Sequence, residues 1–356
     1  MRLLVLGGTW FLGRALVEEA LQLGHEVTTF NRGRTARDVP GIKAVVGDRS
    51  SQTDLEVLAC LGPWDAVVDT SGMVPRDVLA SARALRPRAG RYAFVSTVNA
   101  YQGWPFEPLT EASAVRECAA DASGIPASPD EDAGDRYGRL KAGCERAVMG
   151  VYGQKALVLR PGVIVGPHEY IGRLPWWLRR LRRGGKVLAP GDPDRQIQPV
   201  DARDVAGFTL MALAAGRSGT FNVTAPFGHS TFGELLNACR RTTGGSAELV
   251  WVEDNFVLNR GVRMWTELPL WRTYPGTWRI DGGRARDAGL TCRPLTQTVT
   301  DTWAWLAAGG SVVDSPRAAE IGIDPVKEAA LLAAWAAHRV GKWPCRGEAS
   351  GPPGEA

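Results

Sequence analysis

Little in this 356-residue sequence points to metal binding, disulfide cross-links or membrane insertion. It has only 4 histidines, and its 6 cysteines are so scattered that no close pair has zinc-ligand spacing. We therefore expect no metal site and mostly reduced thiols, as in a cytoplasmic protein. No run of about 18 apolar residues occurs, so no membrane span is expected. The apolar start at Met1 reaches Gly7 too soon for a signal peptide.

An excess of one charge sign is also missing. The 42 Lys and Arg residues against 38 Asp and Glu give a net charge of +4, which does not argue for a nucleic-acid partner. With 44% hydrophobic and 22% charged residues, the chain can bury a large core, which excludes global disorder. Its length predicts about two domains of roughly 150 residues each. Tryptophan is unusually frequent, with 13 residues against 9 Phe and 6 Tyr.

Strand-like and helix-like patterns alternate through the first half of the chain. Short apolar runs predict strands at residues 3–6, 26–30, 44–46, 66–68, 92–95 and 157–159. Between the first two, apolar residues recur at helical spacing until Gly24, a helix stop. Strands separated by helices imply right-handed crossovers. The sequence therefore predicts an α/β fold with a Rossmann-type, doubly wound parallel sheet.

A glycine-rich turn follows the first predicted strand and opens the first predicted helix. A tight turn at Gly7 would let the backbone approach a pyrophosphate, and the helix N-terminus supplies free N–H groups. Gly13 would allow close packing of helix on strand. This strand–turn–helix context predicts a dinucleotide site, although a tryptophan replaces the middle glycine of the G-x-x-G-x-x-G pattern. The predicted contacts are Gly7, Thr9, Trp10, Phe11, Leu12 and Gly13.

The end of the second predicted strand lacks the acid that would hold the adenosine ribose of NAD. It has Asn31, Arg32 and Arg34 instead. Two arginines beside a neutral residue suit a 2′-phosphate, so we predict that NADP is preferred over NAD. The alternative is that both arginines are merely solvated. After the third and fourth strands, further cofactor contacts are predicted at Asp48, Arg49, Thr70, Ser71 and Gly72.

A tyrosine and a lysine lie four residues apart after the fifth predicted strand. Tyr137 and Lys141 would share one face of a helix. The ammonium would lower the pKa of the phenol, and a hydroxyl from the strand end could hold a substrate oxygen. An exposed helix pair without chemistry is the alternative. The position after the fifth strand of a dinucleotide fold favours general acid/base catalysis.

These motifs together resemble the short-chain dehydrogenase/reductase superfamily, and more narrowly its extended, NAD-dependent epimerase/dehydratase family. The resemblance reaches to about residue 305 through residues 7–13, 47–48, 96–97, 137–141, 160–167, 199–206 and 221–223. It implies that Thr97, Tyr137 and Lys141 are catalytic, with Ser96 as the fallback for Thr97. It also implies cofactor contacts at Ser96, Pro161, Gly162 and Val163.

The sequence departs from the family pattern at three places. Trp10 is similar to an atypical branch that includes chloroplast stem-loop RNA-binding proteins. Val98 and Asn99 stand where sugar-nucleotide dehydratases carry Asp-Glu, so elimination of water lacks its acid and base. Val163 stands where sugar-nucleotide epimerases often carry Asn, which weakens the case for a UDP-sugar substrate.

Beyond Gly166 the sequence becomes rich in Arg, Trp, Pro and Gly. We predict a dinucleotide-binding domain over residues 1–166, to which 198–225 returns. A smaller substrate domain would span 167–342, including a late helix over 325–340, and 343–356 would be a disordered tail. The tryptophans of the predicted substrate domain are either core residues or form an aromatic wall for a substrate. The predicted substrate contacts are Asn99, Tyr101, His168, Trp176, Trp177 and Trp271.

The preferred hypothesis is an NAD(P)-dependent oxidoreductase that acts on a carbonyl or alcohol of a small molecule. An epimerase of the same family is the first alternative. A catalytically silent RNA-binding or regulatory relative is the second, and the basic run Arg179–Arg183 is its main support, although most such runs are solvated helix faces. A nucleic-acid partner is not expected, and a homodimer is considered.

Overall fold

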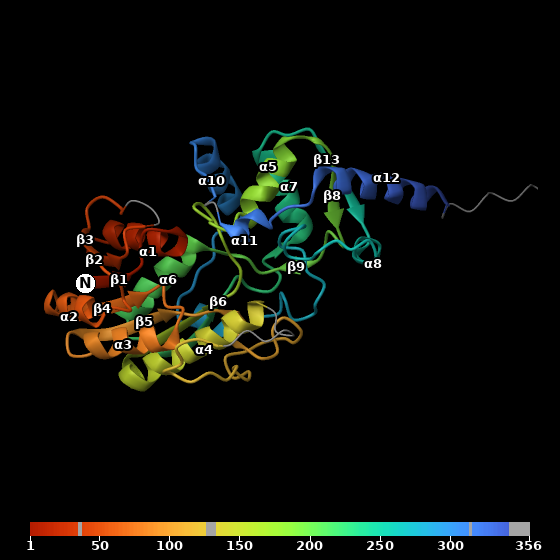
Figure 1. Ribbon diagram of the computed structural model, residues 1–356. Helices are drawn as coiled ribbons and strands as arrows, with labels where there is room; N and C mark the ends of the chain where they lie inside the picture. The colour runs from red at the N-terminus through yellow and green to blue at the C-terminus, as the bar shows by residue number, and fades with distance from the viewer. Residues whose placement is uncertain (35–37, 126–132, 313–314, 342–356) are drawn as a thin grey trace, which may run out of the picture.

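The computed structural model describes residues 1–34, 38–125, 133–312 and 315–341 (Figure 1). Within them, a seven-stranded parallel sheet has the strand order β11-β6-β5-β4-β1-β2-β3. The order reverses at β1, which makes the carboxyl ends of β1 and β4 a topological switch point. The strands are β1 (Arg2–Leu6), β2 (Glu26–Asn31), β3 (Lys43–Val46), β4 (Trp64–Asp69), β5 (Ala89–Val95), β6 (Ala156–Pro161) and β11 (Gly219–Val223).

Helices cover both faces of this sheet, as Figure 1 shows. Apolar side chains of β1 point to both faces of the sheet, so helices must pack against both faces. Leu3 and Val5 pack with the helices of one face, and Leu4 and Leu6 pack with those of the other. The predicted Rossmann-type fold and its strands are confirmed. One face carries α1 (Phe11–Gln22) and α6 (Ala202–Ala214), and the other α2 (Gln52–Cys60), α3 (Pro75–Leu85) and α4 (Ala133–Tyr152).

The chain leaves the sheet after β6 and returns to it with β11, which pairs in parallel with β6. At the crossing, β7 (Ile164–Val165) pairs with β10 (Val200–Asp201). Two short 3-10 helices, η1 (Val98–Ala100) and η2 (Gly153–Lys155), follow β5 and α4. Whether the sheet-bearing part and the remainder fold as separate domains stays a prediction.

The residues outside the seven-stranded sheet and its covering helices are called the second part below. The second part has its own core, around Trp177, Phe232 and Leu236, and lies at the upper right in Figure 1. The predicted late helix is confirmed as α12 (Pro325–Gly341), whereas the predicted tail lies outside the described residues. The other elements are α5 (Arg173–Arg182), α7 (Phe232–Thr242), α8 (Asp254–Leu258), α9 (Gly283–Asp287), α10 (Leu295–Ala307), α11 (Pro316–Ala319) and the pairs β8 (Gly185–Pro190) with β13 (Ala247–Val252) and β9 (Gln196–Ile197) with β12 (Ser230–Thr231).

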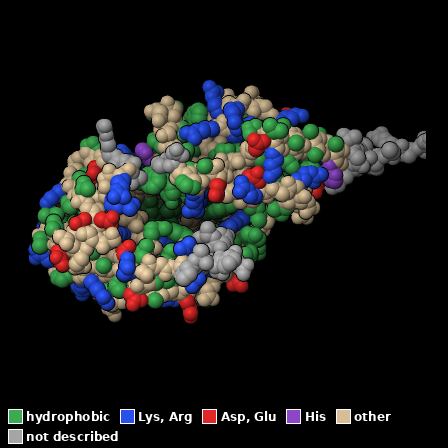
Figure 2. Space-filling view, viewed as in Figure 1, with side chains coloured by type: hydrophobic (Ala, Val, Ile, Leu, Met, Phe, Trp, Pro, Cys, Tyr) green, Lys and Arg blue, Asp and Glu red, His purple; other side chains and the backbone are tan. Residues whose placement is uncertain are grey.

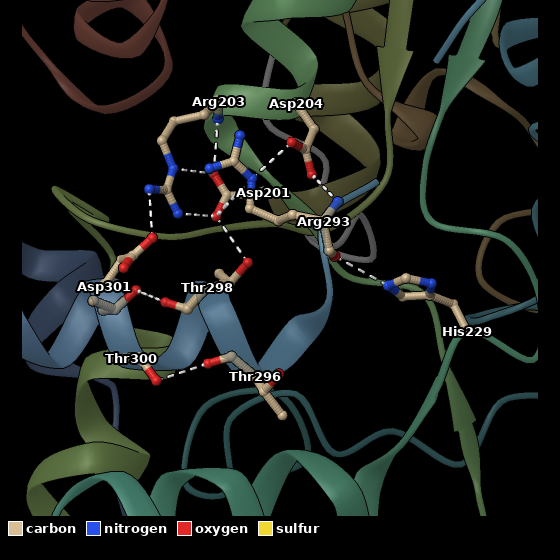
Figure 3. A network of polar contacts seen from close by, with 10 residues as sticks. Asp201, Arg203, Asp204, His229, Arg293, Thr296, Thr298, Thr300 and Asp301 are labelled. Carbon is tan, nitrogen blue, oxygen red and sulfur yellow. Dashed lines mark hydrogen bonds and ion pairs between the residues drawn. The ribbon is translucent and has the colours of Figure 1, made fainter. Parts of the chain in front are cut away.

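A polar network joins α6 to α10 (Figure 3). Asp201 caps α6 by accepting the Arg203 backbone N–H at 2.8 Å, and it also accepts the Thr298 hydroxyl at 2.8 Å. Arg203 in turn donates to Asp301 at 2.6 Å. Burial alone would raise the pKa of Asp201, but the hydrogen bonds from Arg203 hold it below its ordinary value. The network therefore ties the second part to the sheet-bearing part. In the described residues no helix is long and apolar enough to cross a membrane.

Candidate active site

The glycine turn lies at the switch point and has no room for side chains. A Cβ on Gly7 would lie 2.6 Å from the Thr70 hydroxyl oxygen, and a Cβ on Gly13 would lie 2.9 Å from both that oxygen and the Gly8 nitrogen. Thr70 itself is fixed by donating to the Leu6 carbonyl oxygen at 3.1 Å. The N-terminus of α1 has no side-chain cap and no acid in its first turn. Its N–H groups and dipole therefore suit a phosphate.

Trp10, in the position of the missing glycine, contacts the segment between β7 and α5. Its ring centroid lies 4.5 Å from that of Tyr170, which also lies 6.0 Å from Phe11. Phe11 has φ of 39°, a left-handed conformation that non-glycine residues rarely adopt. Sequence reasoning missed Tyr170, because nothing in its local pattern links it to a turn 160 residues earlier. Thr9 and Leu12 are buried beside the turn.

An acid does lie at the end of β2, contrary to expectation. The Asn31 side chain accepts the Gly33 N–H at 2.8 Å and donates to Asp38 Oδ1 at 3.0 Å. The sequence analysis considered only the residues directly after the strand, and Asp38 lies seven positions further on. Arg32 and Arg34 are exposed. Exposure is compatible both with a phosphate contact and with simple solvation.

The two predicted contacts after β3 differ in their surroundings. Asp48 is partly exposed, and its pKa is lowered by hydrogen bonds from the backbone and side chain of Ser50. Arg49 instead forms a two-fold ion pair with buried Asp69, at 3.0 and 2.6 Å. Asp69 also accepts the Tyr92 hydroxyl at 2.9 Å. The Arg49 guanidinium therefore neutralises a buried carboxylate, and a cofactor contact at Arg49 stays a prediction.

The predicted catalytic hydroxyls meet at the carboxyl end of β5. Thr97 caps η1 by accepting the Asn99 N–H at 3.2 Å, and its hydroxyl also faces the Asn99 side-chain oxygen at 3.4 Å. This hydroxyl is close enough to the Tyr137 phenol to counteract part of the rise that burial causes in the pKa of the phenol. α4 lies so close to η1 that a Cβ on Gly138 would fall 2.0 Å from the Asn99 carbonyl oxygen. The Asn99 amide donates to the Gly134 carbonyl oxygen at 3.4 Å. The close contact at Gly138 thus fixes the distance between Thr97 and Tyr137.

Lys141 does not act on Tyr137 as expected. Its buried ammonium donates to the carbonyl oxygens of Gly72 and Val95, at 2.8 and 2.6 Å, and lies 4.1 Å from the Phe94 ring centroid. Burial lowers its pKa. Burial also raises the pKa of Tyr137 to about 12, so the predicted lowering is wrong for this conformation. Lys141 holds the ends of β4 and β5 together, and the phenol keeps its proton.

A buried network lies behind these residues. The Ser96 hydroxyl donates to Glu145, which pairs with Arg160 at 2.9 and 2.5 Å. Ser96 therefore faces the interior, which corrects both its predicted cofactor contact and its role as fallback for Thr97. The Arg160 guanidinium lies 4.5 Å from the Tyr101 ring centroid, and Tyr101, fully buried, donates to Asn222 at 2.7 Å. This burial argues against the predicted substrate contact at Tyr101.

A sequence signal for this network existed, because Glu145 follows Lys141 by four residues on the same helix face. The segment after β6 lies beside the end of β11, where the Gly162 N–H donates to the Val223 carbonyl oxygen at 3.0 Å. Val163 is buried in the core of the second part, whereas Pro161 ends β6. Cofactor contacts at Pro161 and Gly162 stay a prediction.

The predicted aromatic wall is a core. The indole N–H of Trp177 donates to the Pro269 carbonyl oxygen at 2.7 Å, and that of Trp271 to Asp254 at 2.8 Å. Both rings are buried, and Trp176 packs edge-on against Trp177 at 4.7 Å. Stabilisation of the second part therefore accounts for Trp177 and Trp271, and their burial argues against substrate contacts there. Trp176 is only partly buried, and its substrate contact stays a prediction.

A different aromatic group forms around a tryptophan that lies four residues after η1. Trp104, which follows η1, lies 6.3 Å from Trp265, and Trp265 lies 5.9 Å from Trp278. The Arg272 guanidinium lies 4.9 Å from the ring centroids of both Trp104 and Trp265. Figure 2 shows a hollow between the two parts, with hydrophobic and Lys or Arg side chains at its floor. The His168 ring is tilted against that of Trp305, with the ring centroids 5.1 Å apart, and burial lowers the pKa of His168.

Comparison with known proteins identifies the family. The profile of the NAD dependent epimerase/dehydratase family matches residues 3–224. The chain belongs to this family. The chloroplast stem-loop binding protein of 41 kDa b from Arabidopsis thaliana is 25% identical over 260 residues, which cover 68% of this chain and 63% of that protein. The chain thus spans less than two thirds of that relative's length.

Solved structures that are less than 25% identical in sequence resemble nearly the whole chain, and a similarity at this level shows the fold alone. The Bordetella bronchiseptica enzyme WbmH in complex with NAD+ has a TM-score of 0.66 at 19% identity, covering 87% of this chain and 99% of its own. The Thermotoga maritima UDP-glucose 4-epimerase with UDP-glucose has a TM-score of 0.64 at 17% identity, and the match covers 87% of this chain and 99% of that structure. Within the described residues, no group of three or more His, Cys, Asp or Glu side chains could hold a metal ion.

Proposed function

We propose that this protein transfers hydride between a nicotinamide dinucleotide, with NADP preferred, and a carbonyl or alcohol of a small molecule. The close approach of α4 to η1 at Gly138, which brings Tyr137 beside Thr97 at the carboxyl edge of the sheet, carries this proposal. That edge of a doubly wound sheet is where ligands bind in this architecture, and the glycine turn opens onto it.

The residues at the switch point fit a dinucleotide. The backbone of Gly7 and Gly13 offers a close approach that any Cβ would block, and the uncapped N-terminus of α1 would hold the pyrophosphate. Exposed Arg32 and Arg34 would supply the charge that a 2′-phosphate needs. When bound, the nicotinamide ring supplies the site from which hydride leaves or to which it returns.

The chain's own residues perform the proton chemistry. A phenol whose pKa is about 12 is protonated at neutral pH, which is the form that donates a proton to a carbonyl oxygen during reduction. The Thr97 hydroxyl would orient that oxygen. Lys141 acts as a positioning residue, because its two hydrogen bonds to Gly72 and Val95 fix the strand ends beneath the reacting atoms.

Epimerisation of a sugar nucleotide is the second candidate. It is favoured by the family and by structural neighbours named as UDP-sugar epimerases, which match both parts of the chain. The same Tyr137 would then remove and return a proton while hydride leaves and comes back, so no cofactor is consumed. A reductase, in contrast, consumes one reduced cofactor for each turnover.

The test measures both reactions on one preparation. The protein is incubated with a carbonyl panel and NADPH, with cofactor oxidation followed by absorbance, and with UDP-sugars and NAD, with products followed by NMR. Activity in the first arm supports the reductase, and activity in the second supports the epimerase. Tyr137→Phe and Thr97→Val should abolish or strongly lower either activity while cofactor binding is kept. Inactivity in both arms contradicts the proposed chemistry.

The RNA-binding alternative is tested separately. Arg179, Arg182, Arg183 and Lys186 are exposed near the end of α5, where cations also compensate the helix dipole. The relative from Arabidopsis thaliana is named for stem-loop binding. RNA affinity that falls steeply with salt and is lost when these residues are changed to Gln would favour this alternative.

A further inference from the structure

The last two carbonyl oxygens of η1 are both bound by one residue of the loop that follows. The Arg116 backbone N–H donates to the Ala100 carbonyl oxygen at 2.8 Å, and the Arg116 side-chain Nε–H donates to the Asn99 carbonyl oxygen at 3.0 Å. A single 3-10 turn leaves such oxygens without partners inside the turn. Arg116 therefore completes the hydrogen bonding of the turn that Thr97 caps.

The same guanidinium group also reaches α4. Its Nη2 donates to Asp135 Oδ1 at 2.6 Å, in the first turn of α4, and to the Trp104 carbonyl oxygen at 3.5 Å. The side chain of Arg116 is 15% exposed and that of Asp135 is 47% exposed, so the guanidinium is shielded from water although its partner lies at the surface. The bonds to backbone oxygens fix its orientation, which a simple surface ion pair lacks.

η1 and α4 touch directly beside this arginine. A Cβ on Gly138 would fall 2.0 Å from the Asn99 carbonyl oxygen and 3.2 Å from Arg116 Cδ. The Asn99 carbonyl group is therefore enclosed between the arginine and the helix. Thr97 is the cap of η1, and Tyr137 directly precedes Gly138 in α4. A loss of the Arg116 contacts would free η1 to move away from the helix that carries the phenol.

We propose that Arg116 is a positioning residue, which holds η1 on the first turn of α4 and so sets the distance between Thr97 and Tyr137. The inference rests on the proposed function. Arg116 exchanges no proton itself, because a guanidinium stays protonated in proteins. A lysine would fill this place poorly, since an ammonium is a compact point charge, whereas the planar guanidinium presents several N–H groups in fixed directions.

Hydrogen exchange tests the contact without any substrate. Arg116→Gln removes the charge and the fork of donors but keeps the backbone N–H, and Arg116→Lys keeps the charge alone. Amide exchange is followed by mass spectrometry on peptides that cover residues 98–104. Exchange there should be about tenfold faster in Arg116→Gln, because hydrogen bonds from a charged donor are lost, and should be faster than in the parent in Arg116→Lys as well.

Turnover is the second measurement, on the carbonyl compound or UDP-sugar that the parent converts. Arg116→Gln should lower kcat by about 100-fold, which is the effect of a misplacement of about 1 Å, and Arg116→Lys by about tenfold. The KM for the cofactor should stay near that of the parent, because the glycine turn is not altered. A substitution that only destabilised the fold would leave the kcat of the folded fraction unchanged.

Arg146→Gln is the matched control. Arg146 donates to the Cys118 carbonyl oxygen at 2.7 Å, so it joins the same loop to α4, about three helical turns beyond Asp135. This variant also loses one arginine and one bond to a backbone oxygen, but it leaves the contact between η1 and α4 intact. Exchange over residues 98–104 and kcat should therefore both stay at the values of the parent.

Exchange or kcat at the value of the parent in Arg116→Gln overturns the inference. If this variant does not fold, values of the parent in Arg116→Lys overturn it equally. A parent that converts no compound of either panel overturns the proposed function instead, and hydrogen exchange then decides by itself whether Arg116 holds η1.

Discussion

Loss of the Glu145 carboxylate should destabilise the protein strongly. Glu145 and Arg160 are 2% and 5% exposed, and their atoms approach to 2.5 Å. Glu145→Gln preserves the shape and an acceptor for the Ser96 hydroxyl, but it leaves the guanidinium buried without a counter-charge. Breaking a buried ion pair in this way costs about 3–5 kcal/mol. At about 2–4 °C per kcal/mol for a domain of this size, the Tm should fall by roughly 6–20 °C.

Calorimetry on a pair of variants checks the reasoning. The double variant Glu145→Leu with Arg160→Met removes both charges and should recover most of the lost stability, because no charge is left buried alone. The control is Glu18→Gln, which breaks the partly exposed i,i+4 pair between Arg14 and Glu18 and should cost at most about 0.5 kcal/mol. A Tm for Glu145→Gln as high as that of the control would refute the argument from burial.

Three further changes act on other parts of the site. Tyr137→Phe should bind cofactor nearly as the parent does and lose turnover by about two to four orders of magnitude, measured as kcat on a verified substrate; full activity would limit the resemblance to the fold. Gly138→Ala should displace η1, because its Cβ would meet the Asn99 carbonyl oxygen, and should lower kcat by about 100-fold with an unchanged circular dichroism spectrum. Asp201→Asn should destabilise the protein above pH 3.8, where the lowered pKa of Asp201 contributes to the stability of the parent. This contribution is lost as the pH falls through the pKa that Asp201 has in the folded protein. The urea unfolding midpoints of parent and variant should therefore converge in acid.

The sheet was predictable because its strands are buried on both faces. Leu3 to Leu6 form an uninterrupted apolar run, and such runs have few other uses in a chain of this length. The glycine turn was predictable for a related reason, since Gly7 and Gly13 stand where backbone and side-chain atoms leave no room for a Cβ. Both signals are local, and the long-range structure only confirms them.

The site residues were harder to predict, because their roles depend on partners far away in sequence. Lys141 could equally face a tyrosine or two carbonyl oxygens, and only the distance between β4 and β5 decides. Trp177 and Trp271 look the same in a sequence whether they line a wall or a core. Asp38 reaches Asn31 through a loop, so no spacing rule at the strand end could find it.

The contact between Trp10 and Tyr170 joins the glycine turn to the loop before α5. Tyr170 belongs to a loop between Gly166 and Gly172, whose φ values of 135° and 87° are accessible mainly to glycine. A dinucleotide that parted or tightened the two rings would change the free energy of this loop, and with it the affinity of a substrate held by the residues beyond it. Linkage is reciprocal, so that substrate would change cofactor affinity by the same factor. The tryptophan that replaces a glycine would thus make the two binding events interdependent.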